Sequence, residues 1–213
     1  MVRFIAIEGV IGAGKTTLAR MLGEELDAHL LLEVVEENPF LSSFYRDRRK
    51  YAFQTQLFFL LSRYQQYYQL FQEELFTQCV IADYLFAKDR IFAVVNLDDN
   101  ELALYDKIAN LLEQRIPIPD LVIYLQASPE FLLSRIKKRG RAFERHITIH
   151  YLEELCTAYN EYFFAYSASP LLIVNAEEVD FAGREEDFRA LLEEIKSPVK
   201  GVRYWAGTRR DVL

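Results

Sequence analysis

A nine-residue glycine-rich stretch near the start of the chain constrains its fold more than any other segment. It runs Gly9-Val10-Ile11-Gly12-Ala13-Gly14-Lys15-Thr16-Thr17 and fits the phosphate-binding pattern G-x-x-x-x-G-K-S/T at every fixed position. A short apolar run at 3–8 precedes it, and residues 16–26 have helical spacing. We therefore expect a strand that leads into a loop, and a helix that begins at the end of this loop.

Each residue type in this loop can be explained by the way it would bind phosphate or a metal ion. The glycines allow backbone N–H groups to approach phosphate oxygens, and the N-terminus of the following helix adds a favourable dipole. Lys15 is expected to reach the β- and γ-phosphates of a nucleotide, and the Thr16 hydroxyl to bind Mg²⁺, which prefers oxygen ligands. The sequence thus predicts a site for Mg²⁺ and ATP or another NTP, and this context disfavours a glycine turn that binds nothing.

Length and composition favour one ordinary globular domain. The chain has 213 residues, 51% hydrophobic and 27% charged, so we expect a single domain over 1–213 with a tail over about 198–213. The net charge of −7 argues against nucleic-acid or membrane-surface partners, because such proteins need a basic face. Cys79 and Cys156 lack metal-ligand spacing, and neither a signal peptide nor a long apolar span accompanies them, which favours a cytoplasmic protein.

Short apolar runs alternate with helical segments along the rest of the chain. Strands are expected near 3–7, 29–33, 79–83, 121–125 and 171–174. This alternation predicts an α/β fold with a five-stranded parallel sheet and helices on both faces. A helix is expected to begin at Ser128-Pro129, and the other helices are expected at 51–76, 84–93, 99–114, 151–166 and 188–196.

Two carboxylates follow predicted strands. Glu33 comes after the second strand, and Asp83 ends the third. Because ligands in a parallel α/β sheet bind beyond the carboxyl ends of the strands, both should lie at the edge that carries the phosphate loop. Each is a candidate catalytic residue, and Asp83 is also a candidate metal ligand beside Thr16. The glutamates at 36–37 are interpreted as parts of a solvated loop.

The segment 51–76 is rich in aromatic residues and contains no Gly or Pro, which predicts one long helix. It has too many aromatic residues for one face, so we expect it to be covered on several sides or by a second subunit. Gln56 and Arg63 are polar exceptions that lie seven residues apart and therefore on one helical face. Both side chains can bond the edge of a nucleobase, whereas plain surface exposure is the alternative.

A basic segment follows the predicted helix that begins at Ser128. It contains Arg135, Arg139, Arg141 and Arg145 in an otherwise acidic protein. Charge runs are often solvated, but this one follows a strand whose end lies on the phosphate side. We interpret 135–146 as an arginine-rich lid that clamps phosphates, with Arg139 as a catalytic residue that offsets charge on the transferred group.

Taken together, these blocks resemble the deoxynucleoside kinase family over nearly the whole chain. The resemblance is carried by the loop at 9–17, Glu33 before Asn38-Pro39, Tyr45 with Gln56 and Arg63, the segments 83–93 and 121–129, and Arg135-x-x-x-Arg139-Gly-Arg141. It implies phosphorylation of a 2′-deoxynucleoside at its 5′-hydroxyl by ATP or another NTP. Glu33 and Asp83 would be the acidic pair beside that hydroxyl and Mg²⁺, with the base and metal roles open between them.

The resemblance also implies binding roles. Nucleobase and sugar would be held by side chains from several segments: Gln56 on the base, Arg63 and Asp89 setting which base is accepted, and Tyr45 with Glu144 on the 3′-hydroxyl. Arg135, Arg139 and Arg141 would form the lid. The loop of Val179, Asp180 and Phe181 would hold the adenine of the donor, with Phe181 and Arg135 as stacking surfaces.

The sequence departs from the family pattern at one place. The family often has Glu-Arg-Ser or Asp-Arg-Ser after the third strand, whereas this chain has Asp83-Tyr84-Leu85. The source of positive charge near the 5′-oxygen is therefore open, with Lys88 and the lid arginines as candidates. Retention of Arg63 and Asp89 resembles the branch that accepts deoxyadenosine, deoxyguanosine or deoxycytidine.

Two other functions are weighed against this one. A nucleoside monophosphate kinase of the thymidylate type would need an added cationic site, for which Arg46, Arg48 and Arg49 are candidates. A non-catalytic nucleotide-binding regulatory domain is the second alternative. The helices at 51–76 and 99–114 further suggest a homodimer, as the resemblance also implies.

Overall fold

The computed structural model describes residues 4–72, 79–113 and 116–207. Within these residues the centre of the molecule is a six-stranded sheet with the order β2-β3-β1-β4-β5-β6, and every neighbouring pair is parallel. The strands are β1 (Phe4–Gly9), β2 (His29–Leu31), β3 (Val80–Ala82), β4 (Leu121–Gln126), β5 (Leu171–Asn175) and β6 (Val202–Trp205). The predicted α/β class and parallel sheet are confirmed.

The expected number of five strands is wrong, because β6 lies in the segment interpreted as a tail. This strand has only four residues, and Val202 and Tyr204 are more than half exposed. It therefore lacks the continuous apolar run that marks a buried strand in a sequence. Its place is set by pairing with β5, from Leu171 opposite Val202 to Val174 opposite Trp205.

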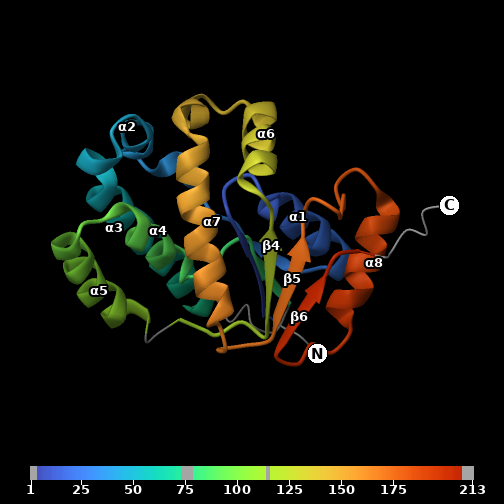
Figure 1. Ribbon diagram of the computed structural model, residues 1–213. Coiled ribbons are helices and arrows are strands. Elements are labelled where there is room, and N and C mark those ends of the chain that lie inside the picture. The colour runs from blue at the N-terminus through green and yellow to red at the C-terminus, as the bar shows by residue number, and fades with distance from the viewer. Residues whose placement is uncertain (1–3, 73–78, 114–115, 208–213) are drawn as a thin grey trace.

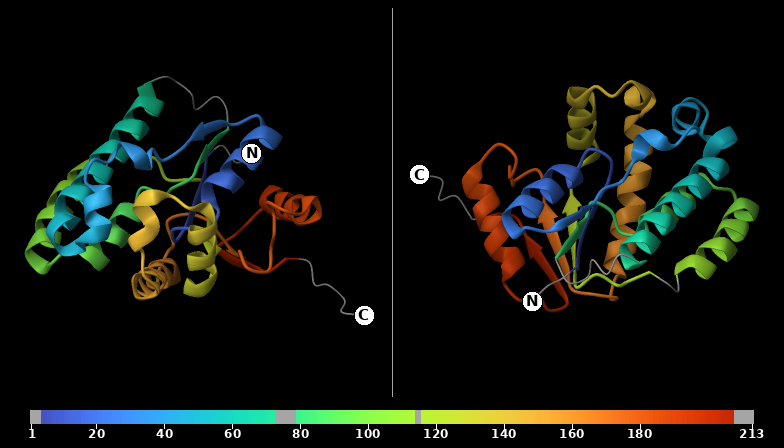
Figure 2. Two further views of the ribbon diagram at one scale, coloured as in Figure 1. Left: turned by 90° about the horizontal axis from the view of Figure 1, so that it is seen from above. Right: turned by 180° about the vertical axis from the view of Figure 1, so that it is seen from behind.

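Helices cover both faces of the sheet (Figures 1 and 2). Helices α1 (Lys15–Leu26) and α8 (Glu185–Lys196) lie on one face, and α4 (Lys88–Asn96) and α7 (Ile149–Phe164) lie on the other. Helices α3 (Arg48–Gln72) and α5 (Asp99–Glu113) pack against α4 at the end of the molecule near β2. None of the helices in the described ranges is long and apolar enough to cross a bilayer.

The lid segment extends beyond the carboxyl ends of the strands. Figure 1 shows α6 (Pro129–Arg139) rising above β4 beside the upper end of α7. Helix α6 begins as predicted, with the Ser128 hydroxyl accepting a hydrogen bond from the Phe131 N–H at 3.3 Å. It ends at Gly140, whose φ of 71° suits a residue without a Cβ. A short 3₁₀ helix, η3 (Ala142–His146), then leads into α7.

Several predicted helix starts differ from the observed ones, among them those of α7 and α8, which begin at Ile149 and Glu185 rather than at 151 and 188. Helix α3 begins at Arg48, three residues before the expected start, and the expected turns at 73–76 lie outside the described residues. The segment after β3 turns through 84–87 before α4 begins at Lys88. This turn separates Tyr84 from the helix and leaves Lys88 and Asp89 in its first turn, where they face the interior.

Candidate active site

The phosphate loop joins β1 to α1 as the sequence predicts. Gly14 is the N-cap of α1 with a φ of 102°, and Gly12 has a φ of 92°. Both values lie in the left-handed region that side chains rarely adopt. A Cβ on Gly12 would also come within 2.9 Å of the Leu132 carbonyl oxygen in α6. The loop can therefore pass under α6 only with glycine at this position.

Lys15 lies at the start of α1 and folds back over its own loop. Its Nζ donates hydrogen bonds to the carbonyl oxygens of Gly9 at 2.7 Å and Val10 at 3.2 Å. Burial lowers the pKa of Lys15 to about 8, and the nearby positive charge of Lys88 adds to this effect. The lysine thus lies in a confined position beside the loop that is predicted to hold phosphates, with Lys88 and several carboxylates near it.

Glu33 and Asp83 meet at the carboxyl ends of β2 and β3, as predicted from their positions after these strands. The Glu33 N–H donates a hydrogen bond to Oδ1 of Asp83 at 2.8 Å. The Thr16 hydroxyl donates one to Oδ2 of the same carboxylate. Asp83 therefore links the start of α1 to the backbone of Glu33, and all three residues line one cavity.

Two cations bracket the Glu33 carboxylate. Arg63 donates to Oε1 from Nε at 3.0 Å and also from its NH2 group, while Nζ of Lys88 lies 2.5 Å from Oε2. Burial alone would raise the pKa of Glu33, but the charges of Lys88 and Arg63 outweigh it and hold this pKa well below its usual range. Glu33 is therefore ionised at any ordinary pH.

A second layer of contacts supports Arg63 from behind. Its NH1 lies 2.7 Å from Oδ1 of Asp89, and Oδ2 of Asp89 accepts a hydrogen bond from the Tyr105 hydroxyl at 3.0 Å. Burial raises the pKa of Asp89 to about 6, although Arg63 and Tyr105 oppose the shift. This row of contacts joins α3, α4 and α5 and explains why two charged side chains can be almost fully buried.

A cavity of about 220 Å³ opens between the phosphate loop, α3, α4 and the lid. Gln56 and Arg63 both line it and are 2% and 3% exposed, so the surface-residue interpretation of this pair is wrong. Within the part of the chain that the structure describes, the Gln56 amide has no hydrogen-bond partner. The other predicted site residues that line this cavity are Gly12, Ile11, Lys15, Thr16, Glu33, Tyr45, Asp83, Arg139, Arg141 and Glu144.

The lid closes one side of this cavity. Arg139 donates to both carboxylate oxygens of Glu144, from Nε at 3.1 Å and from NH2 at 2.6 Å. Arg141 reaches across to Glu36 at 3.2 Å, so this loop glutamate, although largely exposed, does contact the site. Tyr45 stacks on Phe143 of η3 with 6.4 Å between ring centroids. The structure thus brings together the lid residues and the pair predicted for the sugar.

A wider depression of about 720 Å³ lies on the other side of α6. It is lined by Gly12, Gly14 and Thr17 of the loop, by Phe131, Arg135, Lys138 and Arg139 of the lid helix, and by Asp180 among the residues after β5. Arg139 lines both cavities. We call the first one the acceptor cavity and the second one the donor groove.

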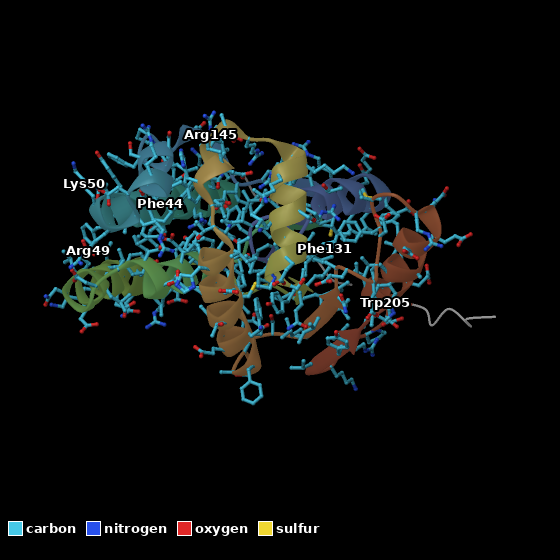
Figure 3. The ribbon with its side chains drawn as sticks, turned by 45° about the horizontal axis from the view of Figure 1, so that its top comes forward. Phe44, Arg49, Lys50, Phe131, Arg145 and Trp205 are labelled. Carbon is cyan, nitrogen blue, oxygen red and sulfur yellow. The ribbon has the colours of Figure 1, made fainter. Side chains whose placement is uncertain are left out.

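Two residues expected in the donor groove lie elsewhere. Val179 and Phe181 are 2% and 3% exposed and belong to the hydrophobic core. The Phe181 ring packs beneath the phosphate loop, where a Cβ on Gly14 would approach it to 3.1 Å. The aromatic side chain in the groove lining is Phe131, which faces outward on α6 in Figure 3 and has the Arg135 guanidinium carbon 5.4 Å from its ring centroid.

Comparisons with known proteins agree with this geometry. The family model described as deoxynucleoside kinase matches residues 5–200. The chain belongs to the deoxynucleoside kinase family. A deoxyguanosine kinase of Bacillus subtilis is 41% identical over 198 residues, which cover 91% of this chain and 96% of the relative. A deoxyadenosine kinase of Dictyostelium discoideum is 37% identical over 206 residues, which cover 94% of this chain and 80% of the relative.

Solved structures give the same result for the fold. The structure of deoxyadenosine kinase from M. mycoides with bound dATP superposes with a TM-score of 0.80 at 30% identity, covering 92% of this chain and 100% of that one. As a deoxynucleoside kinase, this chain is a phosphotransferase that takes its phosphate from a nucleotide. The layered sheet, the phosphate loop and the lid are the parts of the fold that this activity needs.

The three arginines weighed for a monophosphate kinase do not reach the acceptor cavity. Arg46 bonds the Ser42 hydroxyl and carbonyl oxygens, and Arg48 pairs with Glu154 at 2.8 Å while lying over the Tyr151 ring. Arg49 projects away from the molecule in Figure 3. None of the three lines the cavity in the described structure, so they offer no cationic site for a phosphate on the acceptor.

The departure from the family pattern at Tyr84 has a structural counterpart. Tyr84 is fully buried and donates a hydrogen bond from its hydroxyl to the Gln66 side-chain oxygen at 2.8 Å, toward α3. It therefore does not enter the acceptor cavity. Lys88, the first residue of α4, does line the cavity and contacts Glu33. Lys88 and the lid arginines were the candidates to supply the positive charge of the absent arginine. Of these, Lys88 contacts the Glu33 member of the acidic pair.

Three further residues of this deoxynucleoside kinase escaped the sequence analysis. Phe131 lies four residues before Arg135 on α6, so helical spacing was a usable signal. Glu8 is a fully buried carboxylate near the end of an apolar strand. A charged residue in an apolar run was therefore the sequence signal that could have identified it. Tyr105 carries no local signal, because its partner Asp89 lies on a different helix.

Proposed function

We propose that this chain transfers the terminal phosphoryl group of ATP or another NTP to the 5′-hydroxyl of deoxyadenosine, deoxyguanosine or deoxycytidine. The observation that carries the proposal is the direct link between the phosphate loop and the acidic pair, in which Asp83 accepts hydrogen bonds from Thr16 and from the Glu33 backbone. The two named relatives act on deoxyguanosine and deoxyadenosine, which agrees with this range of acceptors.

The acceptor would lie in the acceptor cavity with its base toward α3. The unpartnered amide of Gln56 offers a donor and an acceptor to the base edge, and Arg63 offers N–H groups beside it. Tyr45 and Glu144 line the same cavity near the lid and would bond the 3′-hydroxyl. A nucleoside held at both ends in this way presents its 5′-oxygen to the cluster of Glu33, Asp83 and Thr16.

In the reaction the 5′-oxygen bonds to the terminal phosphorus, the bond from this phosphorus to the bridging oxygen breaks, and the hydroxyl proton passes to a carboxylate. We assign the proton to Glu33, which lines the cavity as a permanently ionised carboxylate. Its depressed pKa makes it a weak base. A weak base suffices because phosphoryl transfer passes through a loose transition state, so orienting the hydroxyl matters more than removing its proton early.

The oxygen atoms of Thr16 and Asp83 fit a magnesium ion. They lie within hydrogen-bond reach of each other beside the phosphate loop. In the described residues no three His, Cys, Asp or Glu side chains form a metal cage, which suits an ion that keeps most of its water and phosphate ligands. Thr16 and Asp83 would hold Mg²⁺, which when bound would neutralise part of the charge of the donor's phosphates.

The donor nucleotide would occupy the donor groove. Its phosphates would meet the backbone of the loop and the arginines of α6, and its base would meet Phe131 and Arg135, whose side chains already stack. Arg139 lines both cavities and is therefore our choice for the cation that stabilises the transferred group. We also propose that the chain works as a single domain, with a lid over about 135–146, in the cytoplasm.

A direct assay tests this function. The protein is incubated with labelled ATP and Mg²⁺ and, separately, with deoxyadenosine, deoxyguanosine, deoxycytidine and their 5′-monophosphates. We expect label in the monophosphate products of the nucleosides, and none with Lys15→Ala, which removes the cation beside the phosphates while its fold, checked by circular dichroism, is kept. Label in diphosphates alone would favour the monophosphate kinase, and no transfer to any acceptor would favour the regulatory domain.

A further inference from the structure

The peptide that joins Leu32 to Glu33 lies just beyond the end of the sheet ladder. The pairing of β2 with β3 ends at Leu31, whose carbonyl oxygen accepts a hydrogen bond from the Asp83 N–H at 3.1 Å. Past this contact, side chains bind the polar groups of the peptide. The Glu33 N–H donates to Oδ1 of Asp83 at 2.8 Å. The Leu32 carbonyl oxygen accepts from Nε2 of Gln66, on α3, at 3.0 Å.

The orientation of the Gln66 amide follows from its contacts. A carbonyl oxygen can only accept, so the NH2 end of the amide must face Leu32. The amide oxygen therefore faces Tyr84, whose hydroxyl donates to it at 2.8 Å. Burial raises the pKa of Tyr84 far above its usual range, so this hydroxyl keeps the proton that it donates. The Tyr84 ring is fully buried and packs edge-on against Tyr67, which fixes the place of the hydroxyl.

These contacts form a closed ring around one peptide. Asp83 and Tyr84 are neighbours in the chain, as are Leu32 and Glu33. The Asp83 carboxylate holds the N–H side of the peptide, and the Tyr84 hydroxyl holds its carbonyl side through Gln66. The backbone of Glu33 is thus fixed relative to Asp83 from both sides. Neither Gln66 nor Tyr84 lines the acceptor cavity in the described structure.

We propose that Gln66 and Tyr84 are positioning residues for phosphoryl transfer, which hold the backbone of Glu33 and thereby place its carboxylate at the 5′-hydroxyl of the acceptor. This inference rests on the proposed function, in which that carboxylate orients the hydroxyl and takes its proton. The two cations that bracket the carboxylate hold only the end of the side chain. A misplacement of about 1 Å can lower a rate on the order of a hundredfold, so the backbone must be held as well.

The first test measures kcat and KM in two variants. Tyr84→Phe removes only the hydroxyl, whereas Gln66→Met keeps the length of the side chain and removes both hydrogen bonds. We expect kcat to fall on the order of tenfold in Gln66→Met and by less in Tyr84→Phe. The KM values for ATP and the deoxynucleoside should stay within about twofold, because neither residue lines the acceptor cavity or the donor groove. A loss through KM alone would overturn the inference.

Combining the two changes tests whether they act together. The double variant should have the kcat of Gln66→Met alone, because the Tyr84 hydroxyl acts only through the Gln66 amide. If the two losses multiply instead, the residues act separately, and the ring of contacts does not position Glu33.

A second test follows the backbone itself rather than the activity. Exchange of the Glu33 amide hydrogen with deuterium, measured by NMR, should be roughly tenfold faster in Gln66→Met, because the peptide is then held on one side only. Unchanged exchange contradicts the inference whatever happens to kcat. If Tyr84→Phe does not fold, Gln66→Met decides both tests.

Two matched controls separate positioning from packing. Tyr124→Phe removes another buried hydroxyl, which donates to Asn160 at 3.1 Å outside both cavities. Gln54→Met changes another half-buried glutamine of α3 that does not line the acceptor cavity. Both should keep the wild-type kcat and the wild-type exchange of Glu33, and equal losses in them would assign the effect to packing.

The outcomes also separate this inference from the kinase function. A wild type that transfers phosphate, with an unchanged kcat in Gln66→Met, overturns the positioning role and leaves the proposed function standing. A wild type that transfers no phosphate to any deoxynucleoside overturns both.

Discussion

Lys88 lies where the chain departs from its family pattern, and its contacts predict what it does. Its Nζ is 2.5 Å from Oε2 of Glu33, and its side chain is 7% exposed. A cation at this point neutralises the acidic pair and offsets charge on the phosphoryl group during transfer. We expect Lys88→Ala to lower kcat by on the order of a hundredfold, with a smaller effect on the KM for ATP, in steady-state assays.

Arg90→Ala is the matched control for Lys88→Ala. It removes a cation from the same helix, but Arg90 is 56% exposed in its side chain and pairs with Asp106 away from the cavity. Its kcat should equal that of the wild type. Wild-type turnover in Lys88→Ala would instead assign the positive charge near the 5′-oxygen to the lid arginines.

Lys15 predicts a pH dependence. With a pKa of about 8, lowered by burial and then by Lys88, it carries its charge below pH 8 and loses it above. Phosphate binding needs the charged form, so kcat/KM for ATP, which reports on the free enzyme, should fall as the pH rises through about 8. Lys88→Ala removes the like charge and should move this fall to higher pH. A fall at the same pH in both proteins would contradict the coupling of the two lysines.

Replacement of Gln56 is expected to affect the KM values of the two substrates differently. Its amide lines the acceptor cavity and has no hydrogen-bond partner among the described residues, whereas the donor groove lies beyond α6. Gln56→Ala should therefore raise the KM for the deoxynucleoside by roughly tenfold or more and leave the KM for ATP within about twofold. Half-buried Gln54, whose side chain bonds the Lys50 carbonyl oxygen and does not line the cavity, gives the control Gln54→Ala. Equal losses for both substrates would make Gln56 a structural residue.

Among single residues, the sequence predicted those whose polar side chains interrupt an apolar or aromatic segment. Glu33 and Asp83 end apolar strands, and Gln56 with Arg63 forms a polar pair on an aromatic helix, so their positions in the site followed from strand order and helical spacing. Tyr105 and the burial of Phe181 did not follow. Their roles depend on which helices pack together, and no local spacing records this.

Glu8 joins three elements of the fold. Its carboxylate accepts hydrogen bonds from the N–H groups of Gly9 at 2.9 Å and Leu85 at 2.8 Å, and from the Tyr159 hydroxyl at 3.1 Å. It thus ties β1 to the segment after β3 and to α7. Glu8→Ala leaves three buried donors unpaired, so the free energy of unfolding, measured with urea, should fall by roughly 2–4 kcal/mol.

Glu24→Ala, on the exposed side of α1, is the control for this prediction and should change the free energy of unfolding by less than about 0.5 kcal/mol. Glu8→Gln keeps one acceptor oxygen and should lie between the two. If Glu8→Ala is as stable as Glu24→Ala, the carboxylate does not hold these elements together.

Elements were predictable where their pattern is local. The run at 121–125 and the Ser128-Pro129 helix start fixed β4 and α6 within a residue. Strand β6 was missed because its residues alternate between exposed and half-buried and it borders the sheet only through β5. The turn at 84–87 was missed because its residues also suit a helix, and the buried contacts of Tyr84 and Leu85 decide its shape.

The site belongs to the whole molecule rather than to any one element. The acceptor cavity needs the phosphate loop, the ends of β2 and β3, two helices of the α3–α5 layer and the lid.

The layer formed by α3, α4 and α5 also carries exposed apolar side chains. Leu61 and Tyr68 lie seven residues apart on α3, and Leu104 and Leu111 lie seven apart on α5, so each pair shares one helical face. We propose that this surface pairs with a second copy of the chain.

The expected assembly is a homodimer of twice 25.0 kDa, measurable by size-exclusion chromatography with light scattering. Leu61→Glu combined with Leu111→Glu places charges on the proposed interface and should give a monomer, because burying unpaired charge costs several kcal/mol. Phe164→Glu is the control, since Phe164 is 95% exposed at the end of α7 and belongs to neither α3 nor α5. A monomeric wild type would exclude the dimer, and a dimer lost only in Phe164→Glu would move the interface to α7.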